Sequence, residues 1–479
     1  MLCENFKYSG LIKYFEEISA IPRASYHEKE IADYLCDFAV SHGFEYYRDE
    51  LNNVLINKPA TKGCENKAPL LFQGHTDMVC EKNNGVEHDF DRDGLKLYED
   101  NGWIRAKGTT LGADDGVAVA TMLYILDGGL DAHGPIQCLF TASEEVGLDG
   151  AKGFDYSRIY ARRMLNMDGA DEALVIAACA GGMRSSFELD ANTRKITAPA
   201  VVKISVKGLF GGHSGEDIHK GRANANKLMG SVLYSVVDDN VCVVSINGGS
   251  KDNAIPRECE AVLAVTDVCA VEARVAEMQR ILSDGLCDDD RDFALTCEVL
   301  ERNVEIDVLD VALARKVIFV MHTVSNGIFD MNNNIKGIVE WSRNFGVIHV
   351  DKDNVKLVFS SRSSFESRID ESARQLDDYA RMLGAKIRHY NRYPGWSFAE
   401  SSELQVKYSQ AYKDVFGNTP VITGIHAGLE CGFISEAVPG IDIISVAPTI
   451  LDLHSPDERL NIASFERFFS VIRRFFELD

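Results

Sequence analysis

The sequence predicts an α/β protein of two domains, and three observations carry that expectation. Strand-like apolar runs alternate with helix-like segments in residues 1–183 and again after Pro394, a pattern typical of α/β domains with a largely buried sheet. The hydrophobicity pattern changes near Arg184, where the strand-like segments begin to alternate between apolar and polar residues. A rough duplication of elements then follows. A chain of 479 residues is long enough for two hydrophobic cores.

The elements of the first domain follow from the spacing of apolar residues. We expect a helix over Gly10–Ile18 and a second over Tyr26–Gly43, where one face is apolar and Gly43 suits a C-cap. A buried helix over Gly116–Leu126 should begin directly after an acidic pair, and a last helix should cover Ser464–Phe476. Strands are expected over residues 53–57, 70–73, 136–142 and 163–167.

The second domain is predicted to be an insertion covering residues 184–393, so that residues 1–183 and 394–479 form one discontinuous domain. Its first half should hold a helix over 224–237 and strands over 201–207, 241–247 and 261–266. Its second half should hold a helix over 371–383 and strands over 334–341, 355–360 and 386–390. The similar order indicates two related α/β halves.

Composition narrows the class of function. A net charge of -23 argues against nucleic-acid and anionic-membrane partners, which require basic surfaces. No run approaches the ~18 apolar residues of a membrane span. The twelve cysteines are scattered without a CxxC pair, as is typical of reduced thiols. Residues 1–10 lack the apolar run of a signal peptide, so we expect a cytoplasmic protein.

Histidines and carboxylates stand where predicted strands end. The segments are His75-Thr76-Asp77, Asp114-Asp115, Glu144-Glu145, Asp168 and His454. In an extended segment, residues i and i+2 share a side, so Asp77 can orient a metal-bound His75. Each segment alone is weak evidence, because polar strand ends and helix-capping carboxylates are common. Together they suit two divalent ions with nitrogen and oxygen ligands, and zinc or manganese fits better than calcium.

The order of these motifs resembles the co-catalytic metallopeptidases, which include carnosinase, succinyl-diaminopimelate desuccinylase and carboxypeptidase G. Among them, the bacterial aminoacyl-histidine (Xaa-His) dipeptidases are the most similar. The resemblance covers nearly the whole chain. It rests on HTDMV at 75–79, LGADDG at 111–116, TASEEVGLDGA at 141–151, GGHSG at 211–215, DIHKGRANANK at 217–227, NAIPRE at 253–258, IHAGLECG at 425–432 and HSPDERL at 454–460.

The resemblance implies a role for each segment of the metal-binding domain. His75 and His454 would each bind one of two divalent ions, with zinc as first candidate and manganese or cobalt compatible. Asp114 would bridge the ions, and Glu145 and Asp168 would complete one ligand set each. Asp77 would orient His75, and Glu144 would be the general base. One departure leaves the register open: the dipeptidase motif commonly reads GADNG, whereas Asp115 takes the asparagine position here.

The resemblance also implies that residues 184–393 form a lid and dimerisation domain. His213 would stabilise the oxyanion and, in the family, often reaches the partner subunit's active site, which implies a homodimer. Asn253, Arg362 and Gly428 would hold the substrate's carboxylate and backbone, with Arg368 as a competitor to Arg362. Outside these assignments, we expect His219, His349 and His389 in loops or on the surface, His426 and Glu430 in the pocket lining or in support of the metal ligands, and Cys431 as a packed thiol.

The implied function is a metal-dependent dipeptidase that hydrolyses unblocked dipeptides, Xaa-His dipeptides among them. Two alternatives remain open from the sequence. The same site could serve an N-acyl amino acid deacylase or desuccinylase, or the chain could be an inactive metal-binding protein. The intact Asp77 and Glu144 argue against the last of these. The glycine pairs lack a phosphate-binding frame, so nucleotide binding has no support.

Overall fold

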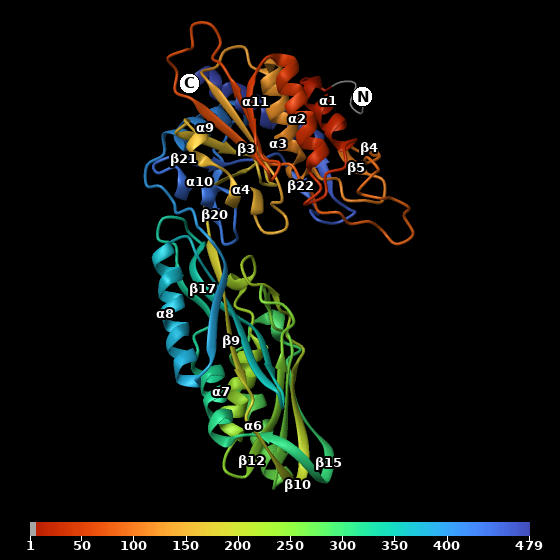
Figure 1. Cartoon of the computed structure of the whole chain (residues 1–479), viewed down its shortest axis with the longest axis vertical. Helices are drawn as coiled ribbons and strands as arrows, with labels where there is room; N and C mark the ends of the chain where they lie inside the picture. The colour runs from red at the N-terminus through yellow and green to blue at the C-terminus, as the bar shows by residue number, and fades with distance from the viewer. Residues whose placement is uncertain (1–5) are drawn as a thin grey trace. The chain divides into compact units, whose positions relative to one another are not determined.

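The computed structural model describes residues 6–479, which form two compact units (Figure 1). Of the described residues, unit 1 comprises 6–179, Trp396–Gly424 and Leu429–Asp479. Unit 2 comprises Ala180–Gly395 and Ile425–Gly428. Residues 1–5, which belong to the segment expected to lack a signal peptide, lie outside the described residues.

Unit 1 is built on a mixed eight-stranded sheet with the order β1-β2-β6-β3-β7-β21-β8-β20. The central strands β6, β3, β7 and β21 are parallel, and β1 and β2 extend the sheet in antiparallel fashion. The strands are β1 (Glu45–Arg48), β2 (Val54–Lys58), β3 (Leu70–His75), β6 (Ile136–Thr141), β7 (Arg163–Asn166), β8 (Leu174–Cys179), β20 (Val421–Ile425) and β21 (Asp442–Ser445). A smaller four-stranded sheet contains β4 (Leu97–Asp100), β5 (Trp103–Ala106), β22 (Ile450–Leu451) and β23 (Arg459–Asn461).

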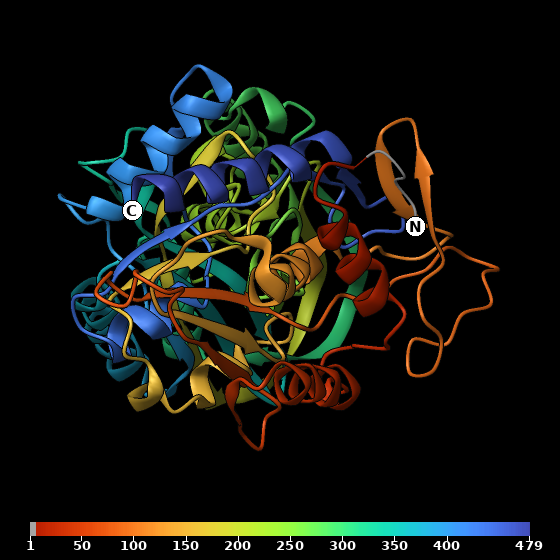
Figure 2. The same ribbon diagram turned by 90° about the horizontal axis from the view of Figure 1, so that it is seen from above.

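Five helices of unit 1 pack with strand residues such as Phe72 and Phe140 into one apolar core. They are α1 (Ser9–Ser19), α2 (Lys29–His42), α3 (Ala113–Tyr124), α9 (Glu403–Phe416) and α11 (Ile462–Leu478). Two shorter helices are α4 (Asp149–Gly153) and α10 (Cys431–Ala437). Figure 2 shows α11, in dark blue, from above. As expected, Gly43 ends α2 in the left-handed conformation, with φ +70°, and its N–H bonds to a carbonyl of the last turn.

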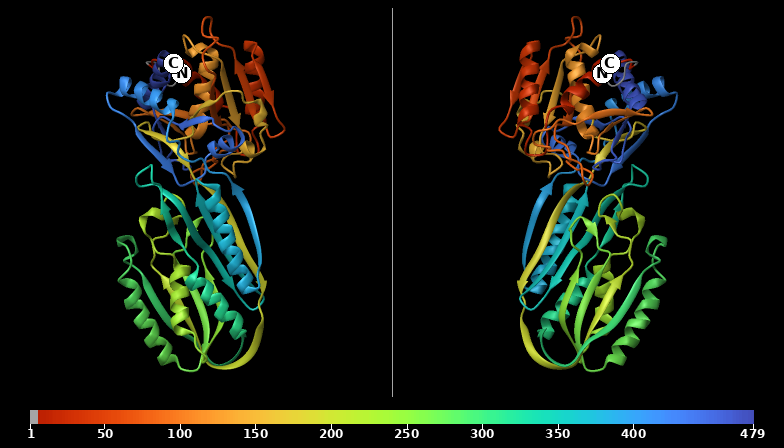
Figure 3. Two further views of the ribbon diagram at one scale, coloured as in Figure 1. Left: turned by 90° about the vertical axis from the view of Figure 1, so that its left-hand side faces the viewer. Right: turned by 90° about the vertical axis from the view of Figure 1, so that its right-hand side faces the viewer.

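Unit 2 contains a nine-stranded sheet whose main path runs β15-β10-β14-β12-β17-β18-β9-β19, with β16 paired to β17 (Figure 3). Its strands are β9 (Gly181–Asp190), β10 (Thr193–Lys207), β12 (Val241–Gly248), β14 (Cys259–Val265), β15 (Ala294–Leu309), β16 (Gly327–Met331), β17 (Val339–Val350), β18 (Asn354–Ser363) and β19 (Lys386–Tyr393). The helices are α5 (Ala225–Val236), α6 (Val268–Ser283), α7 (Val311–Thr323) and α8 (Glu366–Leu383). A two-stranded sheet pairs β11 (Gly212–His213) with β13 (Ala254–Ile255).

The expected duplication is confirmed by strand order. In chain order, β10-α5-β12-β14-α6-β15 and β9-α7-β17-β18-α8-β19 are both βαββαβ units, and each places its strands in the same spatial order. The first unit is inserted whole between β9 and α7 of the second. We call them the inner and outer halves. They join edge to edge, where β12 pairs with β17 through residues such as Ile246 and Val350.

All four helices of unit 2 contribute to one apolar core with the sheet, through residues such as Met229, Val275, Val317 and Leu376. The strand expected over 334–341 is wrong over most of its length, because β17 begins only at Val339. The Asn332 side chain accepts the N–H groups of Asn334 and Ile335, each at 2.9 Å, and this turn breaks the strand.

Within residues 6–479, no helix is both long enough and apolar enough to cross a membrane. The cysteines of the described region are free thiols, five of them buried, and none is disulfide-bonded.

Candidate metal centre and substrate-binding residues

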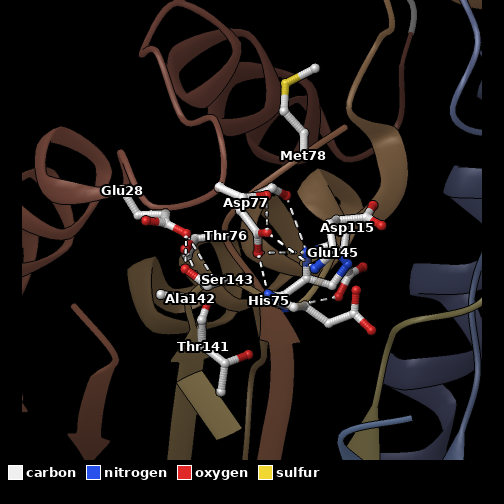
Figure 4. A network of polar contacts seen from close by, with 12 residues as sticks. Glu28, His75, Thr76, Asp77, Met78, Asp115, Thr141, Ala142, Ser143 and Glu145 are labelled. Atoms are coloured by element: carbon white, nitrogen blue, oxygen red, sulfur yellow. Dashed lines mark hydrogen bonds and ion pairs between the residues drawn. The ribbon is translucent and has the colours of Figure 1, made fainter. Parts of the chain in front are cut away.

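His75 ends the buried strand β3, and Asp77 follows two residues later in the same loop (Figure 4). Nδ1 of His75 lies 3.3 Å from a carboxylate oxygen of Asp77 and 3.1 Å from its carbonyl oxygen. Nε2, the other ring nitrogen, faces Asp114. Asp77 also accepts the Ser25 hydroxyl at 2.7 Å. Both side chains are fully buried, so their contacts fix the orientation of the imidazole.

Asp114 lies between two histidines that are hundreds of residues apart in sequence. One carboxylate oxygen is 3.2 Å from Nε2 of His75, and the other is 3.2 Å from Nε2 of His454. His454 is half exposed and has a left-handed backbone, with φ +59°. Asp115 points elsewhere: its buried carboxylate accepts the backbone N–H of His75 at 3.2 Å. The carboxylate of Asp114 therefore faces both histidine rings, whereas that of Asp115 contacts the backbone.

Glu144 and Glu145 follow β6 in a loop that Asp77 also holds. Their backbone N–H groups donate to the two carboxylate oxygens of Asp77, at 3.0 and 3.2 Å. Ser143 before them has a left-handed backbone with φ +53°, an uncommon conformation that clusters at functional sites. The two glutamates come from adjacent positions, and one oxygen of Glu145 lies 3.1 Å from Nε2 of His454.

These side chains form groups that fit metal ions. Ligand atoms lie within 4.8 Å of one another in three sets: His75–Asp114–Asp168, Asp114–Glu145–His454 and His75–Glu144–Glu145. The first two sets share Asp114. Among the described residues, one buried oxygen of Asp168 has no hydrogen-bond donor, which is costly for a carboxylate unless a cation binds there. The donors are imidazole nitrogens and carboxylate oxygens, a set that suits zinc, manganese or cobalt.

Crowding of acidic groups shifts pKa values across this cluster. Burial, with the neighbouring Asp114 charge, raises the pKa of Asp168 to about 7. Burial also raises the pKa of Glu144 well above its ordinary value; the charge of His75 opposes this shift, and nearby carboxylates add to it. Hydrogen bonds to Asp114 and Glu145 raise the pKa of His454 to about 10. For His75, burial favours the neutral ring, but its bonds to Asp114 and Asp77 outweigh this and raise its pKa.

Proton release on metal binding follows from these shifts. In the metal-free protein at pH 7, the raised pKa values keep His75 and His454 protonated and leave Asp168, with a pKa of about 7, partly protonated, whereas histidine ligands must be neutral and carboxylate ligands ionised. We therefore expect binding to release about two to three protons and apparent metal affinity to rise with pH between 6 and 8. Calorimetry in buffers of different ionisation enthalpy measures this release. A binding enthalpy independent of the buffer would contradict it.

The four residues expected to bind substrate lie in unit 2, and they are close neighbours. His213 belongs to β11, and its register partner in β13, Ala254, directly follows Asn253. The carbonyl of Asn253 accepts the N–H of Ser214 at 2.8 Å. Nδ1 of His213 lies 3.2 Å from the N–H of Glu216 and accepts it. Burial, followed by the Arg362 charge, lowers the pKa of His213, so the ring is neutral with Nε2–H as a donor.

Arg362 is a buried cation without a counter-ion. Within residues 6–479, no carboxylate lies within 4.0 Å of its guanidinium, and its Nε has no acceptor. One Nη donates to the Tyr393 hydroxyl at 2.8 Å, and a Cβ at Gly428 would lie only 2.8 Å from the Tyr393 ring. A Cβ at Gly215 would lie 3.3 Å from Arg362 and 3.2 Å from His213. Arg368, the competitor, is exposed and pairs with Asp330 at 3.4 Å.

Several remaining residues also have defined contacts. His349 pairs with Asp351, and His389 with Asp377, both near the surface. Glu430 is fully buried and accepts hydrogen bonds from Gln73 of β3, the strand that ends at His75, and from Thr141, the last residue of β6 before the Glu144 loop. His426 bonds to Ser342 at 2.7 Å. Cys431 is buried, as expected of a packed thiol.

Sequence reasoning missed the loop between α1 and α2. Arg23 donates to the carbonyls of Thr76 and Asp77, and Ser25 donates to the Asp77 carboxylate. Glu28 accepts both the N–H and the hydroxyl of Ser143, at 2.8 and 2.7 Å. The segment IPRASYHE carries no periodicity, and the only available signal was a cluster of polar residues directly after a proline.

Comparison with known proteins agrees with this architecture. A model of peptidase family M20/M25/M40 matches residues 71–478. The cytosol non-specific dipeptidase of Escherichia coli (strain K12) is 36% identical over 463 residues, 96% of this chain and 95% of that protein. The crystal structure of aminoacylhistidine dipeptidase from Vibrio alginolyticus matches with a TM-score of 0.92 at 35% identity, covering 99% of this chain and 97% of that one.

Human carnosine dipeptidase 1, with a TM-score of 0.51 at 13% identity over 98% of this chain and 97% of that one, shares the fold. The predicted fold class and the resemblance to co-catalytic metallopeptidases are confirmed, and neither alternative function is favoured. This protein belongs to peptidase family M20/M25/M40 and is a metallopeptidase.

Proposed function

We propose that this chain is a dinuclear dipeptidase that hydrolyses unblocked dipeptides, Xaa-His dipeptides among them. One observation carries the proposal: the Asp114 carboxylate lies 3.2 Å from both His75 and His454, with Glu145 and Asp168 beside it. A carboxylate shared by two nitrogen–oxygen ligand sets suits two divalent ions. The names of the two relatives, both dipeptidases, support the substrate class.

In this proposal, His75, Asp114 and Asp168 hold one ion, and Asp114, Glu145 and His454 hold the other. Two such ions would lower the pKa of a water and polarise the scissile carbonyl. Glu144 removes a proton from the attacking water and delivers it to the leaving amine, a role that suits a carboxylate whose pKa is raised by burial. Asp77 keeps His75 oriented through Nδ1.

Substrate recognition is assigned to unit 2. The Arg362 guanidinium has no counter-ion and suits a substrate carboxylate. A carboxylate can neutralise its buried charge and accept two parallel hydrogen bonds from it. Gly428 leaves room beside Tyr393, and Asn253 would contact the substrate backbone. His213, with a proton on Nε2, would donate to the developing oxyanion.

Replacement of His213 tests this division of roles. We expect His213→Ala to lower kcat by about 10²–10³-fold, as loss of one oxyanion donor does, while both metal ions remain bound. The measurements are steady-state kinetics and metal content of the same preparation. Loss of metal in this variant would make His213 a ligand and contradict the assignment.

The decisive experiment is a hydrolysis assay over a dipeptide library, with N-acetyl and N-succinyl amino acids as comparison substrates. We expect release of free amino acids from dipeptides and no release of acetate or succinate. Activity should disappear on chelation and return with zinc, cobalt or manganese. Turnover of the acylated substrates alone would replace the dipeptidase proposal with a deacylase.

Three finer assignments belong to the same proposal. We assign zinc as the metal because histidine and carboxylate donors suit it, with manganese and cobalt as alternatives. We assign the chain to the cytoplasm, as the name of its Escherichia coli relative indicates for that protein. We assign it a homodimeric state through a lid and dimerisation domain over residues 184–393, the discontinuous metal-binding domain being residues 1–183 and 394–479 apart from Ile425–Gly428, which belong to unit 2.

A further inference from the structure

Two buried charged residues, Arg23 and Glu458, hold the segment that carries Asp114. Each is only 2% exposed. Neither belongs to the ligand sets described above, and neither contacts substrate-binding residues. Their hydrogen-bond partners are backbone groups of the metal-binding loops, so these two charged side chains act on the positions of the loops.

Glu458 accepts four consecutive backbone N–H groups at the start of α3. One carboxylate oxygen bonds to Leu111 and Gly112 at 2.8 and 2.9 Å, and the other to Ala113 and Asp114 at 2.8 and 3.3 Å. The N–H groups of Ala113 and Asp114 belong to the first turn of α3, where a helix leaves donors unpaired, and those of Leu111 and Gly112 come from the loop just before it. A carboxylate is a favourable acceptor for such a cluster of donors. Glu458 lies four residues after His454, so its bonds connect the His454 loop directly to the Asp114 segment.

Arg23 holds the same segment through a carbonyl. One Nη donates to the Gly112 carbonyl, and the other donates to the carbonyls of Thr76 at 2.9 Å and Asp77 at 3.2 Å. Gly112 is required here, because it has φ +63° and a Cβ would lie 2.5 Å from the Arg23 guanidinium. Arg23 therefore connects the Asp114 segment to the loop of His75 and Asp77.

We propose that Arg23 and Glu458 are positioning residues for the metal centre. They grip Gly112 by its carbonyl and its N–H, respectively, and so hold Asp114 between His75 and His454. The inference rests on the proposed dinuclear function and adds a requirement to it. The three segments that carry the metal ligands keep their spacing through two charged side chains, Arg23 and Glu458, that do not themselves bind metal. Opposite charges in one buried network also limit the cost of burying either charge alone.

The test is metal affinity, measured by chelator competition on the full chain. In Glu458→Gln the amide nitrogen faces backbone N–H donors, so two of the four bonds are lost. We expect both ions to bind about 10–100-fold more weakly, because Asp114 is shared and outer contacts of metal ligands contribute by that amount. The visible spectrum of the cobalt-loaded protein should change as well, because the ligand positions shift.

Arg23→Lys is the companion variant. A single ammonium cannot span the carbonyls of Gly112 and Asp77 as a guanidinium does, so we expect a smaller loss of affinity in the same direction. If both residues act through one segment, the losses in the double variant will be less than multiplicative. Glu458→Asp keeps the charge and should recover part of the affinity, and it replaces Glu458→Gln if that variant fails to fold.

Asp442→Asn is the matched control. Asp442 is a half-buried carboxylate of unit 1 that accepts the Leu404 N–H at 2.9 Å and the Ser402 hydroxyl, at the far end of its strand from the ligands. The Asp442→Asn variant should have a lower free energy of unfolding than the wild type but the same metal affinity. The same result for Glu458→Gln, with wild-type affinity and an unchanged cobalt spectrum, would overturn the positioning role. A wild-type chain that binds no ions would overturn the dinuclear function itself, and with it this inference.

Discussion

Glu144→Ala is expected to keep both metal ions and to lose turnover by about 10²–10⁴-fold, the usual contribution of general acid–base catalysis. Glu144 is absent from the two ligand sets that share Asp114, so its loss leaves those sets intact. What it removes is the group that accepts the water proton. The expected signature is a large fall in kcat, a small change in KM and unchanged metal content, measured on one preparation.

A matched control for this variant is Glu87→Ala, which removes an exposed glutamate outside the site and should leave kcat unaltered. Wild-type turnover in Glu144→Ala would exclude Glu144 as the base. Loss of one ion would point to the third set, His75–Glu144–Glu145, as a real ligand set and would move Glu144 from base to ligand.

Asp114→Asn is expected to release both ions, because each oxygen of this carboxylate faces a different histidine. Outer contacts of metal ligands already contribute about 10–100-fold to affinity, so loss of a shared ligand should exceed about 100-fold for each ion. Activity should fall to the level of the chelated enzyme. Metal content after gel filtration and kcat/KM at added zinc measure the two effects.

Asp115→Asn provides the comparison within the same motif. It restores the asparagine common in this family at a position where the carboxylate is buried, one oxygen lacks a donor, and burial raises its pKa. We expect metal content and kcat close to wild type. The opposite outcome, ions lost with Asp115→Asn and kept with Asp114→Asn, would reverse the register.

Local patterns predicted the elements that position the site. The apolar run before His75 and the run before Glu144 are β3 and β6, whose parallel pairing brings their ends together. Helix α8 was predicted from residue 371 and begins at Glu366, whereas α11 was predicted within two residues at each end. These elements are periodic because one side of each packs into a core, and burial imposes the pattern.

The contacts that complete the site follow from tertiary structure and carry no local signal. Arg23 bonds to a residue 89 positions away, and Glu458 to residues about 345 positions away. Both lie in irregular loops where periodicity gives no information. Likewise, β15 and α6 were not predicted: β15 lies at the edge of its sheet, and α6 has only Val271 and Val275 fully buried, so neither shows a strong apolar pattern.

The insertion of the inner half into the outer half has a consequence for folding during synthesis. Within the inner half, β10, β14 and β15 pair with strands inside Thr193–Leu309, and β12 pairs with β14 there before its other edge meets β17, whereas Asp190 of β9 must wait for Asn354 of β18. At about 5–20 residues per second, the ribosome needs roughly 10–30 s to make the residues between Asp190 and Asn354. The nascent chain therefore completes the inner half first, and β9 stays an unpaired strand edge, open to wrong pairing, until β18 is made.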